Sequence, residues 1–318
     1  MNLIDFFDKC RFWGEKRNPV LQKLRIYGVV NVGVAAIANV VLPIYFYCTQ
    51  NRKCYALPAC SDRKRKIIVS LTSFPKRLPT LHLVIESLLR QRVKPDRIVL
   101  YLTRSQVSDV EKLPKKLLAC RKRGLEIVLC KDEIRSHSKY FYAMQQFPND
   151  TIITVDDDLF YRSDLIETHL KNTQHYPSCV IANWTKQIIP GKNKYNEWPD
   201  MQGVEPMKSK NMLILGVSSV LYPPHSLHKD AFDVENICKL TLTADDVWIT
   251  AMLLKQGTEI VYSGYKYNHL PVHISNNETL ISGNYVRNQI CVDEINRYYA
   301  EKGEKRPFID IVQENQED

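Results

Sequence analysis

The segment Ile67-Ile-Val-Ser-Leu-Thr-Ser73 is a mostly apolar run with charged residues before it and Pro75 after it. A run of this length and composition is typical of a β-strand that is buried on both faces of a sheet. Similar runs follow at residues 97–102, 125–130 and 151–155. The sequence therefore predicts four strands in its first half.

Helical patterns separate these four runs. Between the first two, apolar residues recur at the spacing of one helix face: Leu81, Val84, Ile85, Leu88 and Leu89. Further helices are expected at residues 113–123 and 140–147. Strands that alternate with helices predict parallel pairing with right-handed crossovers, and hence an α/β sheet flanked by helices. Ligands bind such sheets at the carboxyl ends of the strands, so functional residues should follow Ser73, Cys130 and Val155.

Three consecutive carboxylates, Asp156, Asp157 and Asp158, follow the fourth run. Like charges this close raise one another's pKa unless a positive charge lies between them. A divalent cation with oxygen ligands would supply that charge, and Mg²⁺ is typically held by one or two carboxylates together with water and substrate phosphates. The alternative is an acidic turn that caps the next helix, although capping requires only one carboxylate.

A second acidic pair, Asp245 and Asp246, lies at the start of a predicted helix that runs to Gln256. One interpretation is structural, because Thr243 can cap the helix and acidic residues in a first turn favour the helix dipole. The other is catalytic, because a carboxylate here could act as a general base toward a hydroxyl group.

Charge is distributed unevenly along the chain. Residues 1–150 contain 28 Lys/Arg and 12 Asp/Glu, a net +16, whereas residues 151–318 contain 16 and 23, a net −7. The basic half attracts phosphate groups. The acidic half repels them unless a cation lies between the two negative charges. The nine cysteines form no C-x-x-C pair, which argues against a zinc site. The sequence also lacks the glycine-rich fingerprints of P-loop and dinucleotide-binding enzymes.

The N-terminal part contains an uncharged stretch at residues 26–48, and about 20 apolar residues suffice to cross a bilayer. Basic residues flank it on both sides, which disfavours a single orientation across the membrane. We expect residues 1–60 to be a basic, apolar helical segment that associates with a membrane surface, with a true span or a helix buried on the domain as alternatives. Residues 61–302 are expected to be the main domain and residues 303–318 a charged, frayed tail.

Four blocks of sequence resemble, in order, bacterial family 2-type glycosyltransferases of the GT-A fold. They are Val69-Ser-Leu-Thr-Ser-Phe-Pro-Lys-Arg-Leu78 with Leu88-Leu-Arg-Gln-Arg-Val-Lys-Pro-Asp-Arg-Ile-Val-Leu-Tyr101, Ser138-Lys-Tyr-Phe-Tyr-Ala143 with Ile152-Ile-Thr-Val-Asp-Asp-Asp158, Gly216-Val-Ser-Ser-Val-Leu-Tyr-Pro-Pro224, and Ala244-Asp-Asp-Val-Trp248. The similarity covers about residues 67–300. It implies a GT-A-like, Rossmann-type mixed sheet flanked by helices.

The resemblance also implies an activity. Such enzymes move a sugar from a nucleotide-sugar donor to a hydroxyl of a glycan or lipid-linked glycan. By resemblance, Asp156 and Asp158 hold Mn²⁺ or Mg²⁺ on the donor diphosphate, and Asp157 contacts the ribose or the sugar. Asp246 aligns with the catalytic base of these enzymes and implies inversion at the sugar carbon. Asp245 stands where they usually have Glu, so both aspartates are candidates for the base.

The remaining donor-side candidates are polar residues after the predicted strands or at the start of a helix: Thr72, Ser73, Asp132 and Lys139. The resemblance implies that Thr72 and Ser73 lie beside the nucleoside, that Lys139 contacts the base or a phosphate, and that Asp132 reads the edge of the base. The alternative is that all four are polar side chains at the protein surface with no part in binding.

Two late histidines, His269 and His273, are candidates for completing a metal site. We expect a cytoplasmic enzyme peripheral to the inner face of the cell membrane, with no nucleic acid partner. A metal-dependent nucleotidyltransferase or phosphotransferase is the alternative enzyme class, since an acidic cluster after a strand would serve there too. A non-catalytic module that binds polyanions or membranes is a third possibility, supported by the basic first half alone.

Overall fold

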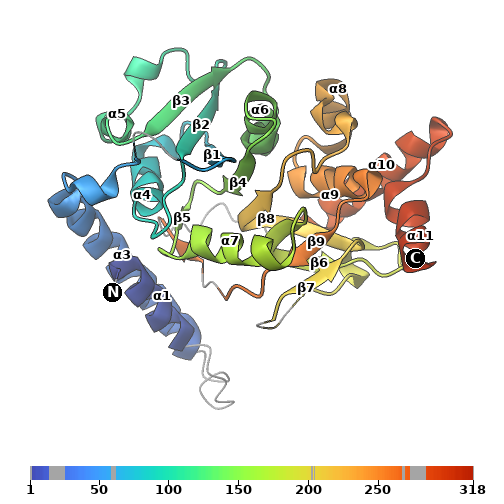
Figure 1. Cartoon of the computed structure of the whole chain (residues 1–318), viewed down its shortest axis with the longest axis horizontal. Coiled ribbons are helices and arrows are strands. Elements are labelled where there is room, and N and C mark those ends of the chain that lie inside the picture. Colours follow the sequence, from blue (N-terminus) through green and yellow to red (C-terminus); the bar gives the residue numbers. More distant parts are fainter. Residues whose placement is uncertain are drawn as a thin grey trace.

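The computed structural model describes the chain at residues 2–13, 26–58, 62–201, 203, 205–266, 269–272 and 284–317. At its centre lies a sheet of eight strands in the order β3-β2-β1-β4-β8-β6-β9-β7 (Figure 1). The strands are β1 (Ile67–Thr72), β2 (Arg97–Thr103), β3 (Leu125–Cys130), β4 (Thr151–Val155), β6 (Val180–Gln187), β7 (Met207–Ser209), β8 (Met212–Tyr222) and β9 (Ile260–Tyr262).

The first four strands of the sheet are parallel, and the pattern changes beyond them. β1 pairs in parallel with both β2 and β4, and β2 pairs in parallel with β3. β8 runs antiparallel to β4 and to β6. The sheet is therefore mixed, which confirms the expected fold class. A separate two-stranded pairing joins β5 (Leu159–Phe160) to β10 (Leu270–Pro271).

Helices cover both faces of the sheet. The larger ones are α4 (Leu78–Leu89), α5 (Lys115–Arg121), α6 (Ser138–Gln146), α7 (Leu165–His175), α9 (Asp245–Gln256) and α10 (Asn284–Glu301). Successive residues of β1 point to opposite faces, so Ile68 belongs to one apolar core and Val69 to the other. The core that contains Ile68 includes α6, α9 and α10, and the core that contains Val69 includes α4, α5 and α7.

The predicted boundaries in the first half agree with the structure to within a few residues. β3 and β4 begin and end where the apolar runs do. α6 begins at Ser138, two residues before the predicted helix. The apolar pattern does not predict this first turn, because Ser138 and Lys139 are polar. Both side chains are nevertheless buried.

The C-terminal residues are ordered, so the expectation of a frayed tail was wrong. Residues Pro307–Ile311 and helix α11 (Val312–Glu317) are helical. Phe308 and Val312 are buried, and the ring of Phe308 stacks on that of Trp198 with their centroids 5.8 Å apart. The buried side chains of Phe308 and Val312, together with a hydrogen bond from Asn211 to the Val312 carbonyl (2.8 Å), attach this otherwise charged stretch to the core.

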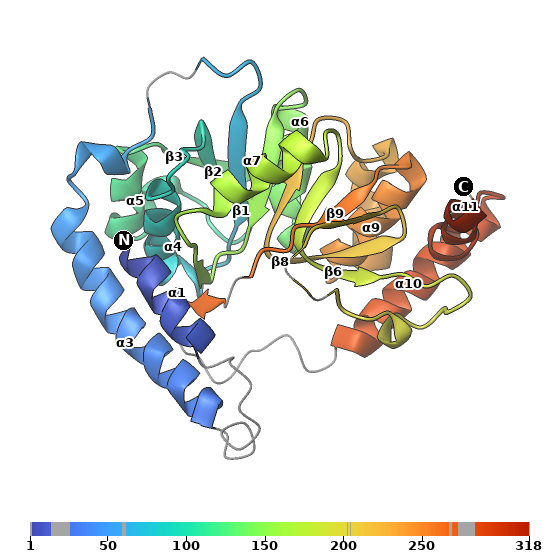
Figure 2. The same ribbon diagram turned by 60° about the horizontal axis from the view of Figure 1, so that its bottom comes forward.

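Two helices, α1 (Leu3–Trp13) and α3 (Ile26–Thr49), lie side by side along one edge of the protein (Figure 1; Figure 2). The expected N-terminal apolar helix is thus present. In the described part of the chain, α3 is long and apolar enough to cross a membrane, as judged by length and composition. α1 is bound to the main domain, because Asp5 accepts hydrogen bonds from the backbone N–H (2.8 Å) and the hydroxyl (2.6 Å) of Ser163.

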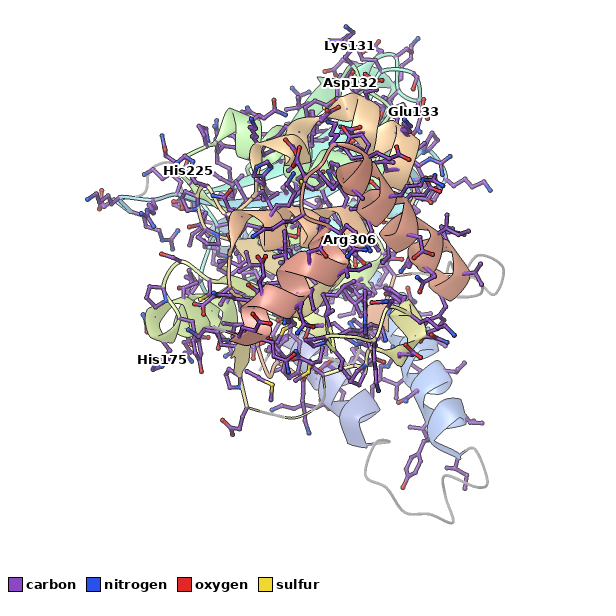
Figure 3. All side chains as sticks on the ribbon, turned by 90° about the vertical axis from the view of Figure 1, so that its right-hand side faces the viewer. Lys131, Asp132, Glu133, His175, His225 and Arg306 are labelled. Atoms are coloured by element: carbon purple, nitrogen blue, oxygen red, sulfur yellow. The ribbon has the colours of Figure 1, made fainter. Side chains whose placement is uncertain are left out.

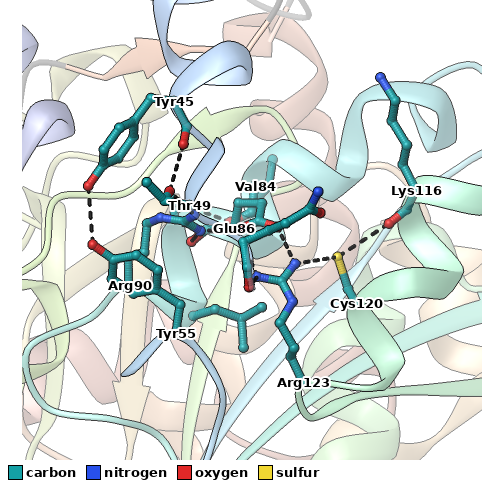
Figure 4. Close-up of polar contacts among 12 residues, drawn as sticks. Tyr45, Thr49, Tyr55, Val84, Glu86, Arg90, Lys116, Cys120 and Arg123 are labelled. Carbon is teal, nitrogen blue, oxygen red and sulfur yellow. Dashed lines mark hydrogen bonds and ion pairs between the residues drawn. The ribbon is translucent and has the colours of Figure 1, made fainter. Parts of the chain in front are cut away.

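A buried charge network joins the end of α3 to α4 (Figure 4). Glu86 forms ion pairs with both Arg90 and Arg123. The buried guanidinium of Arg90 also donates a hydrogen bond to the hydroxyl of Thr49 (3.0 Å) and lies 4.4 Å from the ring centroid of Phe46. Because both Thr49 and Phe46 belong to α3, this helix is an integral part of the fold.

Candidate active site

The carboxyl ends of β1 and β4 and the first turns of α6 and α9 bring together most of the predicted site residues. Ser73 follows β1, and the three consecutive aspartates 156–158 follow β4. Lys139 lies in the first turn of α6, and the aspartates at 245 and 246 begin α9. The site is thus built by parallel strands that end at one edge and by two helices that begin there.

Lys139 is the buried cation at the centre of this cluster. Its Nζ lies 3.3 Å from Oδ1 of Asp156 and 3.4 Å from Oδ2 of Asp245. Burial by itself would lower the pKa of Lys139, but the attraction of Asp245 and Asp156 outweighs it and raises this pKa well above its ordinary value. The ammonium therefore stays charged and holds together two carboxylates that are 89 positions apart in the sequence, 156 and 245.

The two aspartates of α9 have opposite electrostatic environments. Lys139, His137 and a hydrogen bond from the hydroxyl of Ser136 (2.8 Å) outweigh burial and lower the pKa of Asp245. Burial, reinforced by the charge of Asp245, raises the pKa of Asp246. Of the pair, Asp245 is thus the permanent anion, and Asp246 is the group that exchanges a proton most readily near neutral pH.

Strand β8 supplies backbone N–H groups to two of the carboxylates. Gly216 donates to Oδ1 of Asp246 (2.8 Å), and Ser218 donates to Oδ2 of Asp156 (3.0 Å). Ser218 has a φ of 75°, an unusual value for a residue with a side chain. The hydroxyl of Tyr161 donates to the Ser218 carbonyl (2.8 Å) and helps to hold this bend.

The carboxylates of Asp157 and Asp158 bind a second cation, the guanidinium of Arg77. This guanidinium forms an ion pair with Asp157 and another with Asp158, the latter at 3.0 Å. The hydroxyl of Ser73 donates to Oδ2 of Asp157 (2.6 Å). Arg77 was not among the predicted site residues, although it lies only four residues after Ser73 in a segment that carried the family resemblance.

Two of the residues predicted to bind the donor, Thr72 and Asp132, form hydrogen bonds away from the carboxylate cluster. The hydroxyl of Thr72 donates to the Tyr101 carbonyl on β2 (2.9 Å). Asp132 lies at the edge of the molecule beside Lys131 (Figure 3), where its carboxylate accepts a hydrogen bond from the hydroxyl of Tyr142 (3.0 Å). In the described part of the chain, neither residue has a hydrogen bond to the carboxylate cluster.

The structure describes one of the two late histidines, His269. The ring of His269 stacks on that of Trp184, with centroids 5.2 Å apart, and burial lowers the pKa of His269 to about 4. His273 lies outside the described residues.

The carboxylates of the cluster offer oxygen atoms of the kind that a divalent cation prefers. Within the described residues no three His, Cys, Asp or Glu side chains are placed together as a metal site. However, five aspartates (156, 157, 158, 245 and 246) surround two cations, Lys139 and Arg77. Burial raises the pKa of Asp156 to about 6 and also raises the pKa of Asp158, and the charges of neighbouring aspartates add to both shifts. Carboxylate oxygens are preferred ligands of Mg²⁺ and Mn²⁺, which complete their shell with substrate phosphates.

The raised pKa of Asp246 predicts a pH dependence of stability. Because the folded state holds this proton more tightly than the unfolded state, stability should fall as pH rises above about 4, the ordinary carboxylate pKa. Replacing Asp246 with Asn removes the contribution, so wild-type protein should lose more stability than D246N between about pH 5 and pH 8. Chemical unfolding of the ligand-free protein at both values measures the difference.

The control for this experiment is Asp310→Asn. Arg306 lowers the pKa of Asp310 to about 2, so this carboxylate is fully ionised across the tested range. D310N should therefore keep the wild-type slope. Equal slopes for wild type and D246N would show that the proton of Asp246 is not held more tightly in the folded state.

Comparison with known proteins identifies no family for this chain. No model of a protein family matches the sequence, and no curated protein is similar to it. Among solved structures, the chain is similar to the mannosyltransferase PcManGT from Pyrobaculum calidifontis in complex with GDP-Man and Mn²⁺, with 10% identity, a TM-score of 0.41, and coverage of 88% of this chain and 78% of that one.

Two further solved structures show a comparable likeness. An apo UDP-glucose pyrophosphorylase has 11% identity and a TM-score of 0.39, with coverage of 75% of this chain and 99% of that one. A CMP:2-keto-3-deoxy-manno-octonic acid synthetase complexed with CTP has 13% identity and a TM-score of 0.36, with coverage of 62% and 88%. Because all three TM-scores are below 0.5, a functional assignment must rest on the geometry of the site.

Proposed function

We propose that the protein is a metal-dependent glycosyltransferase that moves a sugar from a nucleotide-sugar donor to a hydroxyl acceptor with inversion. The observation that supports this proposal best is the pair of neighbouring carboxylates in opposite electrostatic environments. Asp245 is bound to Lys139 as a fixed anion, whereas the pKa of Asp246 is raised toward the range in which a general base works.

The proton and bond changes of such a transfer can be assigned to these residues. Asp246 accepts the proton of the acceptor hydroxyl as that oxygen forms a bond to the anomeric carbon of the donor sugar. The bond from that carbon to the diphosphate breaks at the same time, and a nucleoside diphosphate leaves. Attack from the side opposite the leaving group inverts the configuration of the sugar.

The leaving diphosphate carries negative charge that must be stabilised. Lys139 and Arg77 lie at the carboxylate cluster and can contact phosphate oxygens there. Asp156 and Asp158 would hold the divalent cation, which supplies Lewis-acid stabilisation of the diphosphate when bound. Ser73 keeps Asp157 in place through its hydrogen bond.

The test is a screen of nucleotide sugars against the purified full-length chain. We expect at least one to raise the unfolding temperature in the presence of Mn²⁺ and to be converted slowly to free sugar and nucleoside diphosphate. Release of pyrophosphate from a nucleoside triphosphate and a sugar phosphate would instead assign nucleotidyl transfer. No stabilisation by any nucleotide or nucleotide sugar, with or without Mn²⁺, would contradict both.

The close approach of Gly216 to Asp246 provides a sharper test of the catalytic assignment. A Cβ atom at position 216 would lie 2.6 Å from Oδ1 of Asp246 and 3.3 Å from Nζ of Lys139. Gly216→Ala should therefore displace the carboxylate of Asp246 and lower the transfer rate by about tenfold or more, since small misplacements of reacting groups are costly.

Gly33→Ala is the matched control, because no atom lies within 4 Å of a Cβ at that position. It should leave transfer unchanged. Equal rates for wild type and G216A, measured at saturating donor, would show that the position of Asp246 does not limit the reaction.

A further inference from the structure

Helix α3 is apolar on two opposite faces, and the protein covers only one of them. The covered face consists of Ala35, Ala38, Leu42 and Phe46, which are all at most 4% exposed. The opposite face carries large apolar side chains at helical spacing: Ile26, Val29, Val32, Ile37, Val40, Ile44 and Tyr47. Their exposures range from 38% for Ile26 to 74% for Tyr47.

These side chains form a patch rather than isolated exposed residues. Fourteen large hydrophobic side chains are exposed in the described part of the chain, and seven of them lie on α3. No charged residue interrupts the helix from Ile26 to Thr49. A contiguous apolar surface of this kind marks an interaction site.

The contacts of the covered face limit the orientation that α3 can take relative to a membrane. The side-chain amide of Asn39 donates a hydrogen bond to the backbone carbonyl of Pro271 (2.9 Å), and Thr49 accepts one from Arg90 (3.0 Å). Residues 35–49 thus lie along the protein (Figure 2). If α3 crossed a bilayer in this arrangement, the domain packed on it would have to enter the lipid. Only a helix lying in the plane of the membrane surface is compatible with the contacts.

The charges near α3 indicate what kind of surface its exposed face can bind. Lys9, Arg52 and Lys53 are exposed next to the helix in sequence or on its partner α1. Over residues 16–61 the sequence contains six Lys/Arg and no Asp or Glu. We propose that the outer face of α3 binds flat on an anionic lipid bilayer, with the apolar side chains among the acyl chains and the basic residues at the headgroups.

Membrane binding at α3 would hold the carboxylate cluster close to the lipid. Pro271, the hydrogen-bond partner of Asn39, pairs with Leu159 between β10 and β5. The next residue, Val272, donates a hydrogen bond to the carbonyl of Asp158 (2.7 Å). One side-chain hydrogen bond and two backbone contacts therefore connect α3 to Asp158, the last residue of the aspartate trio.

The test is flotation of the full-length protein with lipid vesicles. Wild-type protein should float with vesicles of phosphatidylcholine and phosphatidylglycerol, and less with phosphatidylcholine alone or at high salt, where headgroup attraction is screened. The double variant V40E/I44E places two charges on the exposed face and should weaken binding by about tenfold or more. The matched control is V286E/I290E on α10, where both side chains are also exposed.

Both double variants should keep the wild-type unfolding temperature, because the replaced side chains are exposed. Binding of V40E/I44E equal to wild type would overturn the proposal. A wild-type dimer that does not float and that V40E/I44E converts to a monomer would overturn it in favour of self-association. Flotation requires neither a nucleotide sugar nor turnover, so its result is independent of the proposed enzymatic activity.

Discussion

Replacing Asp246 with Asn should lower the rate of sugar transfer by about 10²- to 10⁴-fold, the usual contribution of a general base. The amide keeps the shape of the side chain but cannot accept the acceptor proton. Binding of the nucleotide sugar should change little, because the proposed donor contacts come from Lys139, Arg77 and the aspartates after β4. Steady-state rates and donor binding by calorimetry measure the two effects separately.

Asp245→Asn distinguishes the two carboxylates of α9. Asp245 is an ion-pair partner of Lys139, so its loss should weaken donor binding as well as the rate. D246N should mainly change kcat, whereas D245N should change both parameters. Near-normal turnover of D246N would reject Asp246 as the base.

Replacing Lys139 with Met should have the largest effect on stability. The ammonium is buried between Asp156 and Asp245, and its removal leaves buried carboxylates without their partner. Breaking a buried ion pair in this way costs about 3–5 kcal/mol. We expect a fall of that size in the free energy of unfolding, measured with denaturant at neutral pH.

The double variant K139M/D245N is the internal control. Removing Asp245 together with Lys139 deletes one uncompensated charge, so part of the lost stability should return. A recovery above about 1 kcal/mol would confirm the pairing, and additive effects of the two changes would contradict it. Lys208→Met removes an exposed lysine whose ion-pair partner, Glu259, is also exposed, and it should cost much less.

The parallel half of the sheet could be predicted from the sequence because its strands are buried on both faces. The runs at 125–130 and 151–155 are almost uninterrupted by polar residues, and amphipathic helices separate the strands. The antiparallel strand β8 was predicted only as a region similar to a family segment. Its pairing with both β4 and β6 depends on long-range contacts that no local pattern specifies.

Most residues of the carboxylate cluster could be named from the sequence, but their arrangement in space could not. Consecutive carboxylates after a strand identify Asp156 and Asp158 as candidates, and the helix start identifies Asp246. The contacts of Arg77 with Asp157 and Asp158 were not predicted, because a basic residue after a strand has no distinctive spacing. The backbone contacts from β8 were missed because a positive φ at Ser218 cannot be read from a serine in an apolar run.

The distinction between Asp245 and Asp246 also required three-dimensional information. Their positions in the sequence are equivalent for helix capping, and both are buried or nearly so. The placement of Lys139, His137 and Ser136 around Asp245 gives the two carboxylates different proton affinities.

The network of Glu86, Arg90 and Arg123 affects how a shortened protein would behave. Deleting the first sixty residues to improve solubility would remove Thr49 and Phe46 from the buried guanidinium of Arg90. The same deletion would uncover the apolar side of α4 and free Ser163 from Asp5. A crystallisation fragment that begins after α3 would thus be prone to precipitate, and point substitutions on the outer surface of that helix are the safer way to a detergent-free preparation.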